Sequence, residues 1–75
     1  MKRRNKFDII IAILDVVSSG ANKTKIAYKV DLKLDLATAY MELLLERGMV
    51  RTNGSTYEMT AKGEIFAKKA KELPI

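Results

Sequence analysis

Near its start the chain has a long apolar segment whose few polar residues all fall on one side when it is wound as a helix. When residues 7–19 are wound as an α-helix at about 100° per residue, a narrow polar stripe appears. It consists of Asp8, Ala12, Asp15 and Ser19. The apolar positions around it cover roughly 220°, whereas a surface helix needs about 100° to cover its core. The pattern predicts a helix from about Lys6 to Ser19 with more apolar surface than one domain buries.

Two further amphipathic segments follow a break at residues 18–22. The first predicts a short helix over about Lys23 to Val30. After a tight connection, the second predicts a longer helix that begins at Leu34-Asp35, with Asp35 as its N-cap. Arg47 and Gly48 are typical of a helix end, because a cation in the last turn and a following glycine both stabilise it.

The remaining residues predict a β-hairpin and a last helix. Asn53-Gly54 lies between two β-prone runs, residues 49–52 and 55–59, which is the strongest short-range signal for a hairpin with a type I′ turn. Thr60 can cap a helix over about Ala61 to Leu73, which Pro74 ends. The apolar positions of this helix are Ile65, Phe66, Ala70 and Leu73.

Length and composition limit what the chain can be. Its 75 residues are enough for one domain. A domain of this size buries only about 60% of the surface of its unfolded chain, so it gains stability from disulfides, metals or oligomerisation. The chain contains no Cys and no His, which excludes disulfides and removes the usual zinc ligands. We therefore expect no metal and no cofactor, and oligomerisation as the remaining means of stabilisation.

The same absences argue against an enzyme. Without His or Cys, the chain lacks the common general base and nucleophile near neutral pH. It also has no glycine-rich phosphate loop of either common pattern. A fold of this size rarely encloses the pocket of several hundred Å³ that a substrate needs. The sequence therefore predicts a binding protein.

Charge points toward an anionic partner. The chain carries 14 Lys and Arg against 9 Asp and Glu, a net charge of +5, which is the sign of a nucleic-acid binder. The basic residues 1–6 before an apolar run resemble a signal peptide, but Asp8 and Asp15 interrupt the run, and it is too short to span a bilayer. Its cations lie at one end only, which also disfavours a membrane-surface helix. We expect a cytoplasmic protein without membrane contact.

The order of the predicted elements defines a fold class. A short helix, a tight turn and a longer helix match a helix-turn-helix unit, and the hairpin after it adds a wing. Residues 22–32, 43–50 and 57–63 together resemble the small archaeal winged helix-turn-helix transcriptional regulators. We expect a mostly α fold of order α-α-α-β-β-α over residues 7–73, preceded by a basic arm at residues 1–6. The resemblance implies double-stranded DNA binding, often as a homodimer through the first or last helix, and sometimes a chromatin role in the nucleoid.

Candidate DNA contacts follow from the way a helix-turn-helix docks on DNA. The start of its second helix enters the major groove, while the first helix crosses the backbone. The groove-entering end offers Lys33 and Thr38. The lysines available to the backbone are Lys23, Lys25 and Lys29. The wing offers Arg51, Asn53 and Thr56, which suit phosphate or minor-groove contact. The basic arm can follow a groove through Arg3 and Arg4.

A dimer interface is expected where apolar side chains exceed what one domain buries. The residues expected there are Ile9, Ile13, Val16, Phe66 and Leu73. The lysines of the last helix alternate with Glu64 and Glu72, so they are interpreted as a solvated face.

One feature favours a different function. Residues 31–47 contain two cations, Lys33 and Arg47, against four carboxylates, a net charge of −2. A groove-entering helix of that sign is repelled by DNA unless flanking cations outweigh it. The alternative is a winged-helix module that binds a protein and not DNA, because fold does not fix function. Cations gathered around the third helix and the wing would favour DNA, and a neutral or acidic face would favour a protein partner.

Overall fold

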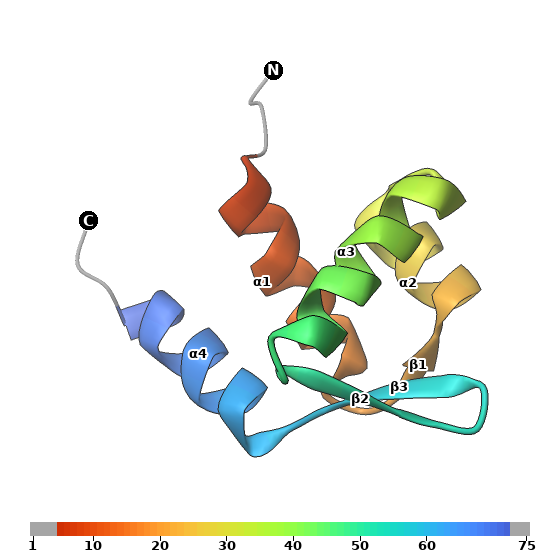
Figure 1. Cartoon of the computed structure of the whole chain (residues 1–75). Coiled ribbons are helices and arrows are strands. Elements are labelled where there is room, and N and C mark those ends of the chain that lie inside the picture. Colours follow the sequence, from red (N-terminus) through yellow and green to blue (C-terminus); the bar gives the residue numbers. More distant parts are fainter. Residues whose placement is uncertain (1–4, 73–75) are drawn as a thin grey trace.

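The computed structural model describes residues 5–72, which form four helices and a three-stranded antiparallel sheet (Figure 1). In chain order these are α1 (Lys6–Val17), β1 (Ala21–Asn22), α2 (Lys23–Val30), α3 (Leu34–Glu46), β2 (Val50–Asn53), β3 (Thr56–Met59) and α4 (Ala61–Glu72). The expected fold class, mostly helical with a winged helix-turn-helix order, is confirmed. No helix within residues 5–72 is long and apolar enough to cross a membrane.

The sheet contains a strand that the hydrophobic pattern did not predict. β1 has two residues, and Ala21 and Asn22 pair with Tyr57 and Thr56 of β3, so that the strand order is β1-β3-β2. Two residues are too few to show an alternating pattern in the sequence. β1 forms because the free edge of β3 offers unpaired backbone groups to a neighbouring segment.

The helix N-termini are capped mostly as their sequences suggest. Asn5 and Asp8 form a capping box at α1, in which the Asp8 N–H donates to Asn5 Oδ1 at 2.8 Å. Asn22 caps α2 through the N–H of Lys25, also at 2.8 Å. The expected cap of α3 is wrong: its N-cap is Lys33, which makes no side-chain cap bond. Asp35 lies inside the first turn, where its carboxylate accepts from the N–H of Leu36.

The hairpin turn differs by one residue from the expected turn. Asn53 pairs with Thr56, so the two loop residues are Gly54 and Ser55. Gly54 has a φ of 67°, whereas Ser55 has a negative φ, so the type I′ turn predicted at Asn53-Gly54 is wrong. Asn53 remains in β2, where its side chain bonds Glu58 across the hairpin.

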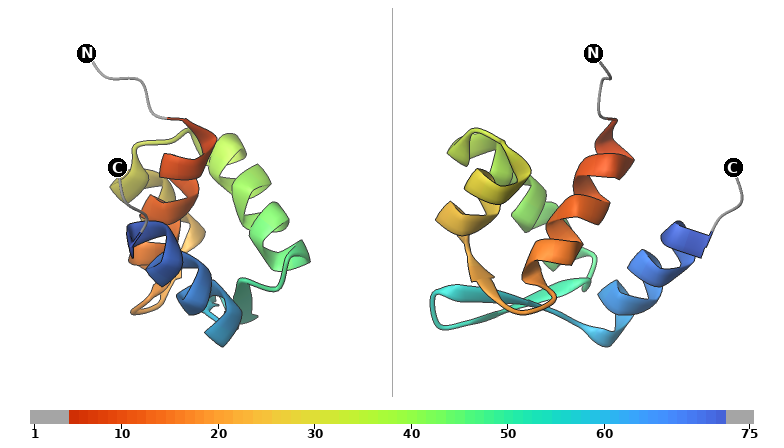
Figure 2. Two further views of the ribbon diagram at one scale, coloured as in Figure 1. Left: turned by 90° about the vertical axis from the view of Figure 1, so that its left-hand side faces the viewer. Right: turned by 180° about the vertical axis from the view of Figure 1, so that it is seen from behind.

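The core lies where α1 meets its neighbours. α1 packs against both α2 and α4, and Figure 2 shows α1 between these two helices. This double packing uses most of the wide apolar arc of α1. Ile13 is 0% exposed, so its expected place on a subunit interface is wrong: it fills the core beside Leu14 and Val17.

α4 is attached to the sheet by a compact junction. The hydroxyl of Thr60 donates to the carbonyl oxygen of Gly48 at 2.6 Å and accepts from the N–H of Gly63 at 3.1 Å, as expected for a cap of α4. From there α4 runs away from the sheet (Figure 2). Ile65, one of the apolar positions of this helix, is 56% exposed.

Candidate nucleic-acid interface

Two of the three lysines of α2 lie on the side of that helix that faces away from the core. Ile26, Ala27 and Val30 are buried, while Lys25 and Lys29, one helical turn apart, are exposed. Tyr28 lies beside these lysines and is 83% exposed. α2 therefore presents a basic strip with an aromatic side chain next to it.

β1 brings the start of α2 to the wing. Asn22, which caps α2, pairs with Thr56, and Thr56 pairs on its other side with Asn53. Lys23 follows Asn22 directly, so three of the predicted contacts, Lys23, Asn53 and Thr56, gather at one end of the sheet. The hydrophobic pattern of the sequence does not predict this grouping, because the pairing depends on a strand of only two residues.

Lys33 and Thr38 lie at the start of α3, beyond the C-terminal end of α2. The eight residues of α2 rise about 12 Å, at 1.5 Å per residue, from the wing end to the C-terminal end of that helix. Lys33 is exposed and can reach a phosphate. Thr38 is half-buried, and its hydroxyl donates to the carbonyl oxygen of Leu34 at 2.8 Å. The Thr38 side chain therefore offers a ligand its acceptor lone pairs.

On the wing, Arg51 is held by a carboxylate that the sequence analysis missed. The Nε of Arg51 donates to Oε1 of Glu58 at 3.2 Å, and Nδ2 of Asn53 donates to Oε2 of Glu58 at 3.1 Å. The hydrogen bond from Asn53 is the main cause that lowers the pKa of Glu58 below its usual value of 4.5, and the hydrogen bond from Arg51 lowers it further. The register that pairs Arg51 with Glu58 would have indicated this contact, had the turn been placed at Gly54-Ser55.

The exposed face of α3 is acidic. The helix sequence from Leu34 to Glu46 contains no Lys, Arg, Asn or Gln. Asp35, Glu42 and Glu46 are all exposed on it. Within the described residues, the cations predicted to contact DNA thus lie on α2, at the N-cap of α3 and on the wing, and none lies on the acidic face of α3.

The other predicted residues are distributed as follows. Arg3, Arg4 and Leu73 lie outside the described residues. Ile9, Val16 and Phe66 are half-buried and pack against the core, and the ring of Phe66 meets that of Phe7 edge-on at a centroid distance of 5.6 Å. Among residues 5–72, the exposed large apolar side chains are Phe7, Tyr28, Leu34, Leu36 and Ile65.

Comparison with known proteins agrees with this architecture. A sequence model of the winged helix-turn-helix family matches residues 3–74. The chain belongs to the winged helix-turn-helix family. Members of this fold class dock on DNA with the second helix of the helix-turn-helix unit, which in this domain is α3.

Two archaeal proteins are similar along almost the whole chain. Both are uncharacterised proteins of Methanocaldococcus jannaschii. One is 28% identical over 72 residues, which are 95% of this chain and 74% of the relative. The other is 33% identical over 72 residues, again 95% of this chain but only 34% of the relative. The chain thus spans about a third of the length of this second relative.

Proposed function

We propose that this winged helix-turn-helix domain binds double-stranded DNA through the phosphate backbone, as a chromatin-type dimer with little base specificity. The observation that carries the proposal is the contrast between α3 and its surroundings. Exposed cations lie on α2, at Lys33 and on the wing, whereas α3 itself has no Arg, Lys, Asn or Gln, the residue types that most often read purines.

The chemistry of base readout supports low specificity. Proteins recognise guanine mainly through Arg or Lys, and adenine through Asn or Gln. α3 has none of these residue types. Its carboxylates can only accept hydrogen bonds, from the amino group of cytosine or adenine, and they repel the phosphates on either side of the groove. Direct contacts from α3 therefore add little sequence discrimination.

Phosphate contacts supply the affinity instead. The five candidate cations within the described residues are Lys23, Lys25, Lys29, Lys33 and Arg51. A dimer doubles this number, and binding of this kind releases counterions and weakens steeply with salt. Such a protein covers DNA without selecting a site, which places it in the nucleoid and lets it influence transcription by occupying the duplex.

A fluorescence anisotropy titration tests the proposal. Two labelled duplexes of unrelated sequence are titrated with the full chain at about 50 and 200 mM salt. If about six phosphates are neutralised, the affinity falls on the order of a thousandfold across this range. Because little base sequence is read, the affinities for the two duplexes should agree within about threefold. In a sequence-specific protein, by contrast, a single mismatched base pair in the site costs ~1–3 kcal/mol of binding free energy.

Matched variants locate the contact surface. Replacing Lys25 and Lys29 by Ala removes two cations from α2, and replacing Lys68 and Lys69 by Ala removes two from α4. The first pair should lose most of the affinity and flatten the salt dependence, while the second pair should bind nearly as the parent does. Absence of binding at 50 mM salt would overturn the proposal, and equal losses for both pairs would overturn its placement on α2.

A second function is favoured by the acidity of α3. Its exposed carboxylates, together with the exposed Leu36, suit a protein partner that carries cations. A winged helix that binds only protein is therefore the function to pursue if the DNA titration fails at low salt.

A further inference from the structure

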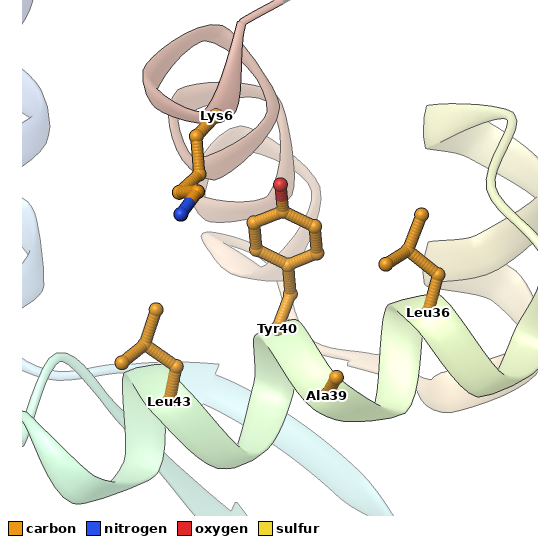
Figure 3. Close-up of a pocket in the computed structure, with 5 residues that line it drawn as sticks. All are labelled: Lys6, Leu36, Ala39, Tyr40 and Leu43. Carbon is orange, nitrogen blue, oxygen red and sulfur yellow. The ribbon is translucent and has the colours of Figure 1, made fainter.

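Tyr28 on α2 presents an aromatic ring to solvent. It is 83% exposed, more than any other large apolar side chain within residues 5–72. The other two tyrosines, Tyr40 and Tyr57, are half-buried and pack against the core. Figure 3 shows Tyr40 pointing from α3 toward the start of α1, where it lines an open groove of about 240 Å³ together with Lys6. Among the described residues none covers Tyr28 in this way, so its ring is available to a ligand.

The surroundings of Tyr28 are basic. Residues 23–33 contain four lysines and one carboxylate, that of Asp31, which gives a net charge of +3. Of the four described helices, α2 is the only one without Asp or Glu. Around the helix, Lys25 lies about 60° from Tyr28 and Lys29 about 100°, on the same flank. Thr24 lies on the other flank, and Asp31 follows at the C-cap.

The lysines of α2 are not placed where they would stabilise the helix. Lys23 and Lys25 lie in its first turn, where the positive end of the helix dipole disfavours a cation and where α2 has no acidic residue. Within residues 5–72, no carboxylate forms an ion pair with these two lysines or with Lys29. Their charges are therefore available to an anionic ligand that lies beside the ring of Tyr28.

An aromatic ring next to cations fits a single nucleic-acid strand better than a duplex. In a duplex each base face is covered by its stacked neighbours, so a protein reaches only phosphates, sugars and base edges. In a single strand the base faces are open, and proteins bind such strands by stacking bases on aromatic side chains while cations hold the backbone. Lys25 and Lys29 are one helical turn apart, about 5.4 Å along the axis, and can hold two phosphates of the same strand.

We propose that α2 binds a single nucleic-acid strand, with an unpaired base stacked on Tyr28 and phosphates held by Lys25 and Lys29. Every base has a flat face, so this site accepts strands of any sequence. No residue of α3 takes part, and the exposed face of that helix stays open to a duplex. The inference shares two lysines with the proposed function but does not depend on duplex binding.

Two variants separate stacking from a simpler role of Tyr28. On a duplex, its hydroxyl could donate a hydrogen bond to a phosphate without any contact between the ring and a base. Tyr28→Phe keeps the ring and removes the hydroxyl, whereas Tyr28→Ala removes both. Because the side chain is exposed, both variants should fold as the parent does, which circular dichroism verifies.

Fluorescence anisotropy with two labelled strands measures the contribution of the bases. One strand has about ten thymidines, and the other has the same length and the same phosphates but abasic sugars. At low salt, the full chain should bind the thymidine strand roughly 5- to 150-fold more tightly, which is the effect of stacking one base on an aromatic side chain. A uridine strand of equal length distinguishes RNA from DNA as the source of the strand, and base-dependent binding of either supports the inference.

The variants should divide into three groups. Tyr28→Ala should bind the thymidine strand as weakly as the abasic one, while Tyr28→Phe should stay within about threefold of the parent. Lys25→Ala should weaken binding to both strands alike, because both carry the same phosphates. Ile65→Ala removes an exposed apolar side chain from α4 and should change neither affinity. Equal binding of the two strands by the parent, or equal losses for Tyr28→Phe and Tyr28→Ala, would overturn the inference.

Tyrosine fluorescence gives a second measurement, since the chain has three tyrosines and no tryptophan. Stacking of a base on Tyr28 should quench the emission of that one tyrosine when the unlabelled thymidine strand is bound. Tyr28→Phe should bind the same strand without this quenching. Unchanged emission of the parent at saturation would contradict the stacked geometry.

The outcomes for the two proposals are distinct. Salt-sensitive binding of duplexes together with equal binding of thymidine and abasic strands would retain the proposed function and remove this inference. Base-dependent binding of the single strand through Tyr28, with no binding of duplexes at 50 mM salt, would do the reverse.

Discussion

Arg51 and Glu58 face each other across the wing, with the Nε of the arginine 3.2 Å from a carboxylate oxygen. The two residues are paired directly across strands β2 and β3. Asn53 donates a hydrogen bond to the other oxygen of the same carboxylate. In a domain whose proposed affinity comes from phosphate contacts, Glu58 competes with DNA for the guanidinium group. The ion pair therefore lowers the contribution of Arg51 to binding while it keeps the side chain in place.

Replacing Glu58 by Gln should strengthen DNA binding. Glutamine retains an oxygen acceptor for one donor but leaves the positive charge of Arg51 available to a phosphate. One additional phosphate contact steepens the salt dependence by about 0.9 and raises the affinity at 50 mM salt on the order of tenfold. Anisotropy titrations of the variant measure both quantities. Glu72→Gln changes the net charge equally but lies on α4, and an increase of the same size in this control would show a non-specific charge effect.

The wing should lose stability in acid through the same carboxylate. The pKa of Glu58 is lowered in the folded state, so its contribution is present above the ordinary pKa of 4.5 and is lost as the pH falls through the lower folded value. Urea unfolding followed by circular dichroism at pH 7 and at pH 3 measures this loss. The parent should lose more stability than Glu58→Gln over this interval, and parallel losses in the two proteins would contradict the assignment.

Truncation should destabilise the domain at Ile13 but hardly at Ile65, although both are isoleucines in helices. Ile13 is 0% exposed, so Ile13→Ala should reduce the free energy of unfolding by about 2–5 kcal/mol. Ile65 is exposed, and Ile65→Ala should change the stability of the monomer by less than about 0.5 kcal/mol. Urea unfolding at a protein concentration below that of dimer formation separates the two cases. A small effect at Ile13 would contradict its place in the core.

Gly63 should not tolerate a side chain, although it lies in a helix. A Cβ at this position would collide with the carbonyl group of Met49 at the junction between α4 and the sheet. Gly-to-Ala substitution in a helix interior normally stabilises by about 1 kcal/mol. At Gly63 we expect the opposite sign, a destabilisation of about 1–3 kcal/mol from overpacking. The midpoint of urea unfolding gives the sign, and a stabilised Gly63→Ala variant would show that the junction can move apart.

The helices could be predicted because the information that specifies them is local. Alternation at the helical period, the Asn-Gly signal and capping residues such as Thr60 all act within a few residues along the chain. These signals placed α2 at its observed bounds, and they placed the other helices and the wing within a few residues of theirs. They also identified the lysines of α2 as solvent-facing, since only one side of that helix is apolar.

The tertiary structure decided which surfaces of these elements pack against each other. The sequence showed that α1 has a surplus of apolar side chains, but only packing against α2 on one side and α4 on the other assigned Ile13 to the core. Likewise, Asn22 pairs with Thr56 although the two residues are far apart in the sequence. Arg51 pairs with Glu58 only because the hairpin turn lies at Gly54-Ser55, which sets the register of the two strands. Sequence alone thus determined the elements and their charges, because these depend on neighbours in the chain. The fold determined which charges meet and which apolar groups remain exposed, because these depend on contacts between elements.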